Sequence, residues 1–204
     1  VLFRSSNTPG RCLFIGWMSN WLYAAKLPTA PWRGAMTLPR ELQLREMDGH
    51  AWLCTPVAAE IESAFQSGSV IQIQTSHDLS QALANSQGRC RLTLTADAAT
   101  SWALQLSNAQ GDIWRLHYNP ETRQFGVDRT MAGQSDFHPE FAACHLAPRF
   151  AHSSVIHLQV YLDACLMETI ADDGLSAITS LSFPSSTWTG IEREGNVDVS
   201  LQTL

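Results

Sequence analysis

The sequence has little charge and no concentration of charge of one sign. Only 16% of its 204 residues are charged, the formal net charge is −6, and no run of Lys or Arg occurs. A nucleic-acid groove or an acidic membrane surface binds through such a basic cluster, so we expect neither partner. No apolar run approaches the roughly 18 residues of a membrane-spanning helix. The 45% of hydrophobic residues still suffices for a substantial core, which excludes a disordered protein.

Signatures of several common catalytic and metal sites are also missing. No GxSxG nucleophile elbow occurs, and neither do the phosphate-binding patterns GxGxxG and GxxxxGK. The cysteines lack CxxC spacing; they are Cys12, Cys54, Cys90, Cys144 and Cys165. Five histidines lack HxH and HxxxH pairing; they are His117, His138, His145, His152 and His157. We therefore expect no metal and no cofactor, and the odd number of scattered cysteines favours reduced, buried thiols.

Beyond residue 66, apolar residues alternate with polar ones, which is the pattern of half-buried strands. The alternating rows are Ile71 and Ile73; Leu92 and Leu94; Trp102, Leu104 and Leu106; Trp114, Leu116 and Tyr118; Ile156, Leu158, Val160 and Leu162; and Val197, Val199 and Leu201. Turn residues separate the rows, and we expect a hairpin turn at residues 172–174. Because no βαβ rhythm is present, the pattern predicts an all-β fold, with an antiparallel β-sandwich and almost no helix over residues 68–204.

Two segments have helical character. Residues 56–65 follow Thr55, which suits an N-cap, and begin with Pro56, which suits the first helical position. We therefore expect a short linker helix within residues 56–67. The stretch from Asp78 to Ala84 fits either one helical turn or a loop. The linker coincides with a change in charge, because residues 1–66 carry a net charge of +1 and the remaining residues a net charge of −7.

The densest aromatic segment is residues 14–42, with the sequence FIGWMSNWLYAAKLPTAPWRGAMTLPREL. Trp17 and Trp21 lie close together in it, with Ser19 and Asn20 between them. Flat aromatic faces beside amide and hydroxyl groups suit a sugar, because the rings cover its C–H face and the polar groups bind its hydroxyls. Tryptophan is mostly buried in proteins, so a core role for the two indoles stays open as the alternative.

The same segment resembles glycoside hydrolase family 32, the β-fructosidases. GWMSNW at residues 16–21 and WRGAMTLPREL at residues 32–42 are similar to the last propeller blade of that family. Within the family they are closer to levanases and exo-inulinases than to sucrose-phosphate hydrolases. Segments similar to the family's C-terminal sandwich are WRL (114–116), TRQF (122–125), VDRT (127–130), FHPEF (137–141), VYLD (160–163) and DGL (173–175). The resemblance extends over residues 12–204.

The resemblance implies the last part of a five-bladed β-propeller followed by a C-terminal antiparallel β-sandwich. Residues 1–55 are then the partial last blade, residues 56–67 the linker helix and residues 68–204 the sandwich. It further implies a retaining hydrolase that releases terminal β-linked fructose from levan, inulin or sucrose. Together with the aromatic pattern, it makes Trp17, Asn20 and Trp21 the expected substrate-binding residues, and a fructan or sucrose the expected partner of the intact protein.

The family's catalytic motifs are absent from this sequence. Retention needs one carboxyl group as nucleophile and a second as general acid/base. Family members carry the essential acids in the motifs WMNDPNG, RDP and EC, none of which occurs here. We therefore expect no catalytic residue in this chain and no activity from it alone. Glu41, the one acid inside the matching blade, is interpreted as the end of a structural element, and Arg33 and Arg40 are interpreted as structural.

Two classes of function stay open. The first is the C-terminal fragment of a fructan-degrading hydrolase, and the second is a non-catalytic, lectin-like sandwich that binds carbohydrate or a partner. Residues 1–5, VLFRS, contain no initiator Met, and we interpret them as a translated adapter sequence in front of a truncated gene. The compartment is undetermined, because reduced thiols favour the cytoplasm whereas a fructan substrate favours secretion.

Overall fold

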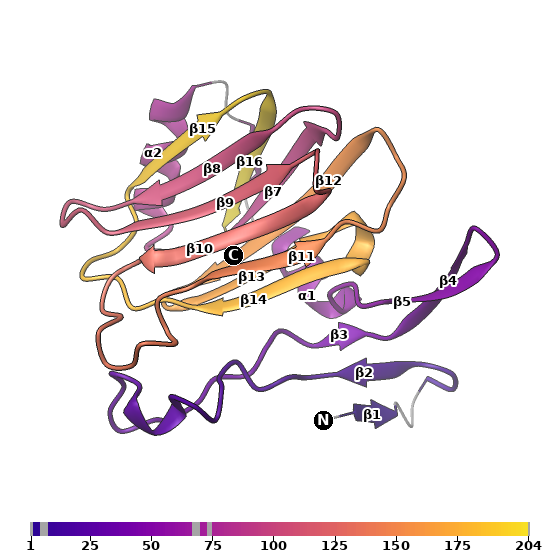
Figure 1. The fold of residues 1–204 in the computed structure, drawn as a ribbon, viewed down its shortest axis with the longest axis horizontal. Coiled ribbons are helices and arrows are strands. Elements are labelled where there is room, and N and C mark those ends of the chain that lie inside the picture. The colour runs from indigo at the N-terminus through magenta and orange to yellow at the C-terminus, as the bar shows by residue number, and fades with distance from the viewer. Residues whose placement is uncertain (1, 5–7, 67–69, 73–74, 204) are drawn as a thin grey trace.

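A computed structural model describes residues 2–4, 8–66, 70–72 and 75–203, and its regular secondary structure consists mainly of strands (Figure 1). The strands are β1 (Leu2–Arg4), β2 (Cys12–Phe14), β3 (Arg40–Glu41), β4 (Gln43–Met47), β5 (His50–Cys54), β6 (Val70–Gln72), β7 (Arg89–Asp97), β8 (Trp102–Ser107), β9 (Ile113–Asn119), β10 (Gln124–Met131), β11 (Cys144–Pro148), β12 (Val155–Asp163), β13 (Leu166–Ala171), β14 (Ser176–Leu181), β15 (Gly190–Glu194) and β16 (Val197–Thr203). The helices are α1 (Ala59–Gln66) and α2 (Ser76–Asn85), with short 3-10 turns η1 (Ala24–Lys26) and η2 (Asp172–Gly174). The expected all-β class is confirmed.

Two large antiparallel sheets form most of the molecule. One has six strands in the order β14-β13-β12-β7-β16-β6, and the other has five in the order β11-β10-β9-β8-β15. Figure 1 shows the two sheets as stacked layers. Strands that are neighbours along the chain pair as hairpins, as β13 and β14 do across η2, where the sequence predicts a turn. Of the predicted row Ile71 and Ile73, only Ile71 lies within the described residues, in β6.

The main hydrophobic core lies between these two sheets. The predicted alternating rows supply it from both sides, with Leu92 and Leu94 from β7, Leu104 from β8, Leu116 from β9 and Leu158 from β12, all buried. Because side chains of a strand point alternately to its two faces, each row places its apolar members in the core and its polar members outside. The period-two pattern therefore predicted the core residues of this part correctly.

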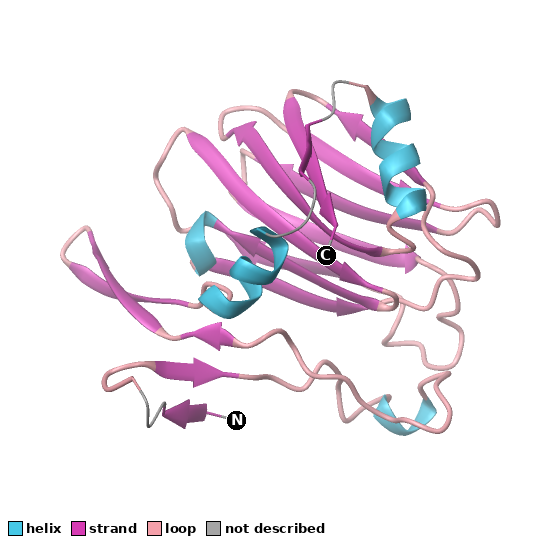
Figure 2. Ribbon diagram, turned by 180° about the vertical axis from the view of Figure 1, so that it is seen from behind, coloured by secondary structure: helices cyan, strands magenta, loops and turns pink. Residues whose placement is uncertain are grey.

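Helix α2 departs from the expectation that little helix follows residue 68. It covers residues 76–85, a longer span than the single turn or loop considered from the sequence. The hydroxyl oxygen of Thr75 accepts a hydrogen bond from the backbone N–H of Asp78 at 3.2 Å, which caps its first turn. Leu79 and Leu83 are fully buried against the main core. The helix forms because it covers the end of the core beside β15 (Figure 2). There the hydroxyl of Ser80 accepts a hydrogen bond from the N–H of Ile191.

The N-terminal part adds a small sheet, a projecting hairpin and helix α1. Strands β1, β2 and β3 form an antiparallel three-stranded sheet, and β4 pairs with β5 to form the hairpin that points away from the molecule in Figure 1. Helix α1 packs on the outer face of the six-stranded sheet (Figure 2). There Phe65 and Ile61 pack with Tyr161 and Ile170. No helix in the described part of the chain is long and apolar enough to cross a membrane.

Helix α1 begins at Ala59, three residues later than the cap and proline signals predict. Residues 56–58 are extended instead, because the N–H of Ala58 donates to the carbonyl of Pro39 and the carbonyl of Pro56 accepts from the N–H of Glu41, each at 2.9 Å. Thr55 is not the N-cap, because the helix begins four residues after it; its N–H instead donates to the carbonyl of Gly174 at 2.9 Å. Pairing with a distant segment therefore overrides the local helix signal.

Candidate functional site

The aromatic segment singled out in the sequence forms a loop held at its base by antiparallel backbone pairing. The N–H of Met18 donates to the carbonyl of Ala35, and the N–H of Thr37 donates to the carbonyl of Gly16, both at 2.8 Å. Trp17 and Met36 form a β-bridge between these two arms. We call residues 16–37 the aromatic loop. Its closed base fixes the positions from which the tryptophans project.

Gly34 explains how the indole of Trp17 is seated. A Cβ atom placed on Gly34 would lie 2.8 Å from Nε1 of Trp17, which is closer than real Cβ contacts. The ring therefore lies directly over the backbone of residue 34, and any larger residue there would displace it. This contact joins the two resembling segments GWMSNW and WRGAMTLPREL, which the sequence separates by ten residues.

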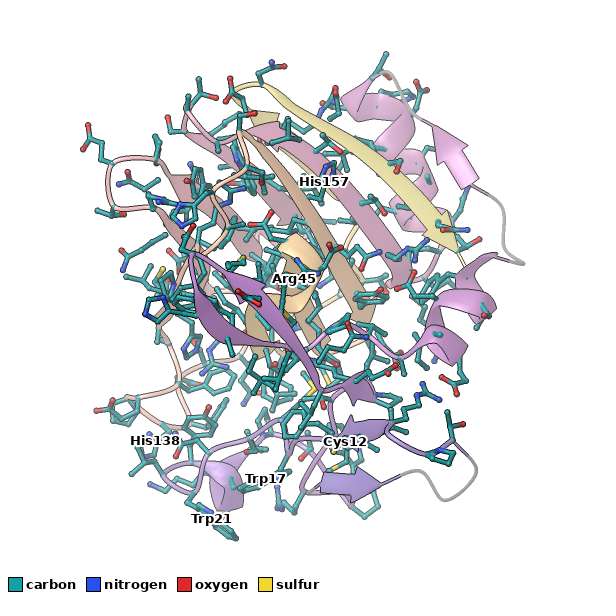
Figure 3. The ribbon with its side chains drawn as sticks, turned by 90° about the vertical axis from the view of Figure 1, so that its right-hand side faces the viewer. Cys12, Trp17, Trp21, Arg45, His138 and His157 are labelled. Carbon is teal, nitrogen blue, oxygen red and sulfur yellow. The ribbon has the colours of Figure 1, made fainter. Side chains whose placement is uncertain are left out.

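Trp17 and Trp21 meet at the surface of the aromatic loop. Their ring centroids are 4.8 Å apart, and the ring planes are inclined by 56°. Trp17 is 36% exposed and Trp21 is 88% exposed, and Figure 3 shows both at the same end of the molecule. Within this chain neither indole is a core residue. Two exposed indoles in contact present an apolar aromatic face of the kind that sugars bind.

Asn20 also lies at this surface, where its side chain shapes the loop. Its Oδ1 atom accepts a hydrogen bond from the N–H of Leu22 at 2.9 Å, and its backbone carbonyl accepts from the N–H groups of Tyr23 and Ala24. These bonds start the turn that leads into η1. The side-chain amide nitrogen has no acceptor among the described residues, so Asn20 can hold the loop through its oxygen and donate to a ligand through its nitrogen.

The underside of the aromatic loop is anchored to the sheets. Tyr23 and Leu27 are buried, and they pack with Phe141 and Leu181 in a second hydrophobic cluster. The ring of Tyr23 meets that of Phe141 edge to face, with centroids 5.3 Å apart. The anchored side reduces the freedom of the loop, so the exposed tryptophans are held in place before any ligand arrives, which lowers the entropic cost of binding.

Trp32 is a feature of the site that the sequence reasoning did not assign. It is 43% exposed and lines a depression of about 560 Å³ together with Phe183 and Trp188. The sequence could have indicated this role, because the segment WRGAM places a third tryptophan on the same loop. Arg33 holds this arm, because its Nη1 donates to the carbonyls of Leu27 and Thr29 at 2.6 and 2.7 Å. The structural interpretation of Arg33 therefore agrees with its contacts.

The acids near the aromatic loop are engaged in structural contacts. Glu41 lies at the end of β3 and accepts a hydrogen bond from Nε of Arg11 at 3.3 Å. The same guanidinium donates two bonds of 2.6 Å to Glu60, and this pairing lowers the pKa of Glu60 to about 2. A general acid in glycoside hydrolysis needs a raised pKa. Glu60 therefore cannot serve as the acid, and Glu41 has the element-end position expected from the sequence.

The histidines and cysteines do not assemble a metal site in the described part of the chain. No group of three or more candidate ligands occurs there. All five cysteines are free thiols, but the expected burial holds only for Cys54 and Cys90, whereas Cys144 is exposed and Cys12 and Cys165 are partly exposed. Burial lowers the pKa of His117 and of His145, with a further lowering from Arg115 and Arg129 respectively. His138 packs beside Tyr23 with ring centroids 6.0 Å apart, so it belongs to the anchor of the aromatic loop.

Family comparisons match nearly the whole chain in two successive parts. "Glycosyl hydrolases family 32 N-terminal domain" matches residues 3–56, and "Glycosyl hydrolases family 32 C terminal" matches residues 60–203. The chain belongs to glycosyl hydrolase family 32. The N-terminal match contains the aromatic loop, whereas the C-terminal match contains the two large sheets. Helix α1 begins at the junction of the two matches.

Individual family 32 proteins give the same result. The chain is 28% identical over 212 residues to a levanase of Bacillus subtilis, which covers 97% of this chain and 31% of the levanase. It is 30% identical over 181 residues to an extracellular exo-inulinase of Aspergillus awamori, which covers 84% of this chain and 34% of the relative. The chain thus spans about a third of the length of these curated relatives.

Solved family 32 structures share the fold. The crystal structure of an exo-inulinase from Aspergillus awamori superposes with a TM-score of 0.72 at 24% identity, covering 94% of this chain and 39% of that one. A β-fructofuranosidase from Schwanniomyces occidentalis, complexed with fructosyl-erythritol, superposes with a TM-score of 0.70 at 17% identity, covering 98% of this chain and 46% of that one. At these identities the likeness concerns the fold.

Proposed function

We propose that this chain is the C-terminal part of a retaining family 32 hydrolase that releases terminal β-linked fructose from levan, inulin or sucrose. The observation that carries the proposal is the match of the family's N- and C-terminal domains, in that order, to residues 3–56 and 60–203. The levanase and exo-inulinase relatives support a fructan as substrate. No nucleic acid or membrane partner is part of the proposal.

The domain organisation proposed for the chain follows the same division. Residues 1–55 form the last blade of the five-bladed propeller, residues 56–67 the linker that contains helix α1, and residues 68–204 the antiparallel β-sandwich. The two stacked sheets around one core and the position of α1 support this division. The small sheet of β1, β2 and β3 is the corresponding part of the blade.

Trp17, Asn20 and Trp21 are proposed to bind the terminal fructose unit. Their support is the exposed pair of indoles in contact and the free amide nitrogen of Asn20, on a loop whose underside is anchored. The indoles would cover the C–H face of the sugar, and the amide would donate to a hydroxyl. Because such contacts exist in the ground state and in the transition state, they contribute mainly uniform binding.

The catalytic carboxylates are proposed to lie outside these 204 residues. The motifs WMNDPNG, RDP and EC are absent from the sequence, and Glu41 and Glu60 are both bound by Arg11. A retaining mechanism needs both carboxyl roles, so the chain alone supplies neither nucleophile nor acid/base. Its contribution to the intact enzyme is one wall of the substrate pocket and the sandwich that supports it.

A chimera tests the proposal. The part of the Bacillus subtilis levanase that precedes its match to this chain is joined to residues 12–204, and fructose release from levan, inulin and sucrose is measured. We expect release by the chimera and none by the 204-residue chain, with the unmodified levanase as positive control. A folded chimera that binds levan but releases no fructose would contradict the assignment to the hydrolase.

A second function, carbohydrate binding without catalysis, is favoured by one feature of the five-stranded sheet. A depression of about 780 Å³ lies on it, lined by polar side chains that include His117 and Asp128. Arg115 and Glu194 form a bidentate ion pair at 2.8 and 2.7 Å in its wall. Retardation of the chain in gels that contain levan or inulin, abolished by Arg115→Ala and unaffected by Trp21→Ala, would support this alternative.

A further inference from the structure

A further cavity lies where the aromatic loop meets the sheets, and Trp17 borders both this cavity and the exposed tryptophan face. Its volume is about 300 Å³. The loop and β3 contribute Trp17, Ser19, Tyr23, Thr37 and Arg40, whereas β10, β11 and β14 contribute Arg129, His145, Thr179 and Leu181. Phe14, Gly16 and Met18 complete the lining. Polar and charged side chains thus share the wall with apolar ones, in a space between two parts of the chain that are far apart in the sequence.

The cavity wall contains a buried positive charge without a matching carboxylate. Arg129 is 2% exposed, and its guanidinium donates to the carbonyls of Phe141 and Leu181 and to the hydroxyl of Tyr23, at 2.8, 3.1 and 3.3 Å. None of the described carboxylates pairs with it. The second guanidinium, of Arg40, is paired with Glu168. The wall therefore has one positive charge in excess, and a buried charge without a counter-charge is costly.

The polar atoms around the cavity are mainly donors that lack acceptors. Nε of Arg40, Oγ of Ser19 and Nε2 of His145 are buried and have no partner among the described residues. An arginine Nε–H can only donate, a serine hydroxyl can donate, and an imidazole nitrogen donates in one tautomer. Buried polar groups are normally satisfied, so three orphans in one cavity call for a ligand or solvent.

Two threonine hydroxyls extend this donor set. The oxygen of Thr37 accepts from the N–H of Gly16 at 2.9 Å, and the oxygen of Thr179 accepts from Nη2 of Arg40 at 3.0 Å. Each of these hydroxyls therefore keeps its own hydrogen for donation to a further group. Glu168, the carboxylate that could accept them, is already engaged by Arg40 and by the N–H of Leu38.

We infer that this cavity binds a small oxyanion of the sulfate, phosphate or carboxylate class between the aromatic loop and the sheets. An oxyanion accepts hydrogen bonds at every oxygen and supplies the missing negative charge, and charge-assisted bonds are stronger than neutral ones. Water would satisfy the donors but would leave Arg129 without an anionic partner, because its guanidinium otherwise contacts neutral oxygens and the faces of the Phe141 and Tyr23 rings. A neutral sugar would likewise supply no negative charge to pair with Arg129. The inference is independent of the proposed hydrolase function, because the hydrogen-bond donors it uses are not the residues proposed to bind fructose, although Trp17 borders both places.

Bound in this place, the oxyanion joins the two parts of the chain. It would take hydrogen bonds from Ser19 and Thr37 on the loop and from His145 and Thr179 on the sheets. Ligand binding to the folded state alone raises stability in a saturable manner. Burial and the charge of Arg129 lower the pKa of His145, and a neighbouring anion acts in the opposite direction.

Thermal unfolding of the 204-residue chain tests the inference. Sodium chloride is replaced stepwise by sodium sulfate, sodium phosphate or sodium acetate at constant ionic strength. Sulfate and phosphate also stabilise proteins generally, but that effect grows without saturating. We expect a saturable component in addition, with a rise in Tm of about 3 °C or more at ten times the Kd. The arm with the lowest half-saturating concentration identifies the class of oxyanion.

Ser19→Ala and His145→Phe separate a site from a general salt effect. Ser19→Ala removes a hydroxyl that has no partner, so the fold loses no bond, while the half-saturating concentration should rise about 10-fold. His145→Phe should do the same, whereas His117→Phe, in the other depression, is the matched control and should leave the response unchanged. In NMR titrations the saturating anion should raise the pKa of His145 and not that of His117. An unsaturating response that is equal in all four proteins, or a His145 pKa that the anion leaves unchanged, would overturn the inference.

Discussion

The side chains of Arg40 and Glu168 form an ion pair that is buried between the N-terminal part and the six-stranded sheet. The two side chains are 6% and 4% exposed, and the residues are 128 positions apart in the sequence. Glu168 also accepts a hydrogen bond from the N–H of Leu38, and Arg40 donates to the hydroxyl of Thr179. The pair thus ties the end of the aromatic loop to β13 and β14, and removing either partner would leave a buried charge unpaired.

Glu168→Gln should therefore be strongly destabilising. We expect a loss of about 3–5 kcal/mol in the free energy of unfolding, measured by denaturant titration, because the guanidinium of Arg40 loses its counter-charge. Asp163→Asn is the control, since it removes the partner of Arg89 from an exposed pair and should cost about 1 kcal/mol or less. A loss below about 1 kcal/mol for Glu168→Gln would show that the pair does not hold the two parts together.

Truncating the exposed indole should barely affect stability. Trp21→Ala is expected to change the free energy of unfolding by about 0.5 kcal/mol or less, because the side chain is almost fully exposed. Trp188→Ala is the control for a buried indole and should cost about 3–5 kcal/mol. If Trp21→Ala cost as much as Trp188→Ala, the ring would belong to the core and its assignment to a sugar site would fail.

The same substitution should weaken substrate binding in the levanase chimera. A large apolar side chain packed against a ligand contributes roughly 1.5–3 kcal/mol. We therefore expect kcat/KM on levan to fall by about 10- to 100-fold for Trp17→Ala and for Trp21→Ala, mainly through a higher KM. Leu44→Ala, on the exposed hairpin, is the control and should leave both constants unchanged. A fall in kcat at constant KM would contradict a role in ground-state binding.

Alkaline pH should destabilise the protein through Tyr161. Burial, and then the hydrogen bond that its hydroxyl donates to Glu62, raise the pKa of Tyr161 above the usual value of 10. The raised pKa means that the unfolded chain releases this proton first, so the stabilisation is fully present below pH 10 and is lost as the pH rises further. The free energy of unfolding should fall by up to about 1.4 kcal/mol per pH unit above pH 10 because of this group.

Tyr161→Phe isolates that contribution. The variant should be less stable than the wild type at pH 7, because Glu62 loses a hydrogen bond, but its stability should fall less steeply between pH 10 and pH 11.5. Chemical denaturation at several pH values measures both slopes. Parallel slopes for the two proteins would show that Tyr161 does not determine the alkaline limit.

Gly174 should tolerate no side chain. Its φ is +83°, and a Cβ atom would lie 2.3 Å from the backbone nitrogen of Pro56. Gly49 is a matched control, because its φ is +72° but a Cβ atom there would meet nothing within 4 Å. We expect Gly49→Ala to cost about 1 kcal/mol and Gly174→Ala at least about 3 kcal/mol, measured by denaturant unfolding. Equal losses of stability for the two variants would show that Thr55 and Pro56, which follow β5, move away from Gly174 without cost.

The features of this fold that depend on local sequence pattern could be predicted from the sequence. Alternation of apolar and polar residues has a period of two in a strand whatever the strand pairs with, so the rows around Leu92, Leu116 and Leu158 identified both the β class and the core side of each strand. The GWMSNW and WRGAMTLPREL segments identified the family, because they are long and rich in rare residue types. The absence of the motifs WMNDPNG, RDP and EC, which carry the family's essential acids, was likewise established from the sequence alone.

Tertiary contacts decided the features that join distant segments. The start of α1 at Ala59 depends on pairing of residues 56–58 with Pro39 and Glu41, and α2 forms where Leu79 and Leu83 can cover the open end of the core. The partner of Arg40, the enclosed charge of Arg129 and the exposure of Trp21 have no local signal either. Each depends on which segments the folded chain brings together, and the energy of a buried charge or an exposed ring is set by those neighbours rather than by its place in the sequence.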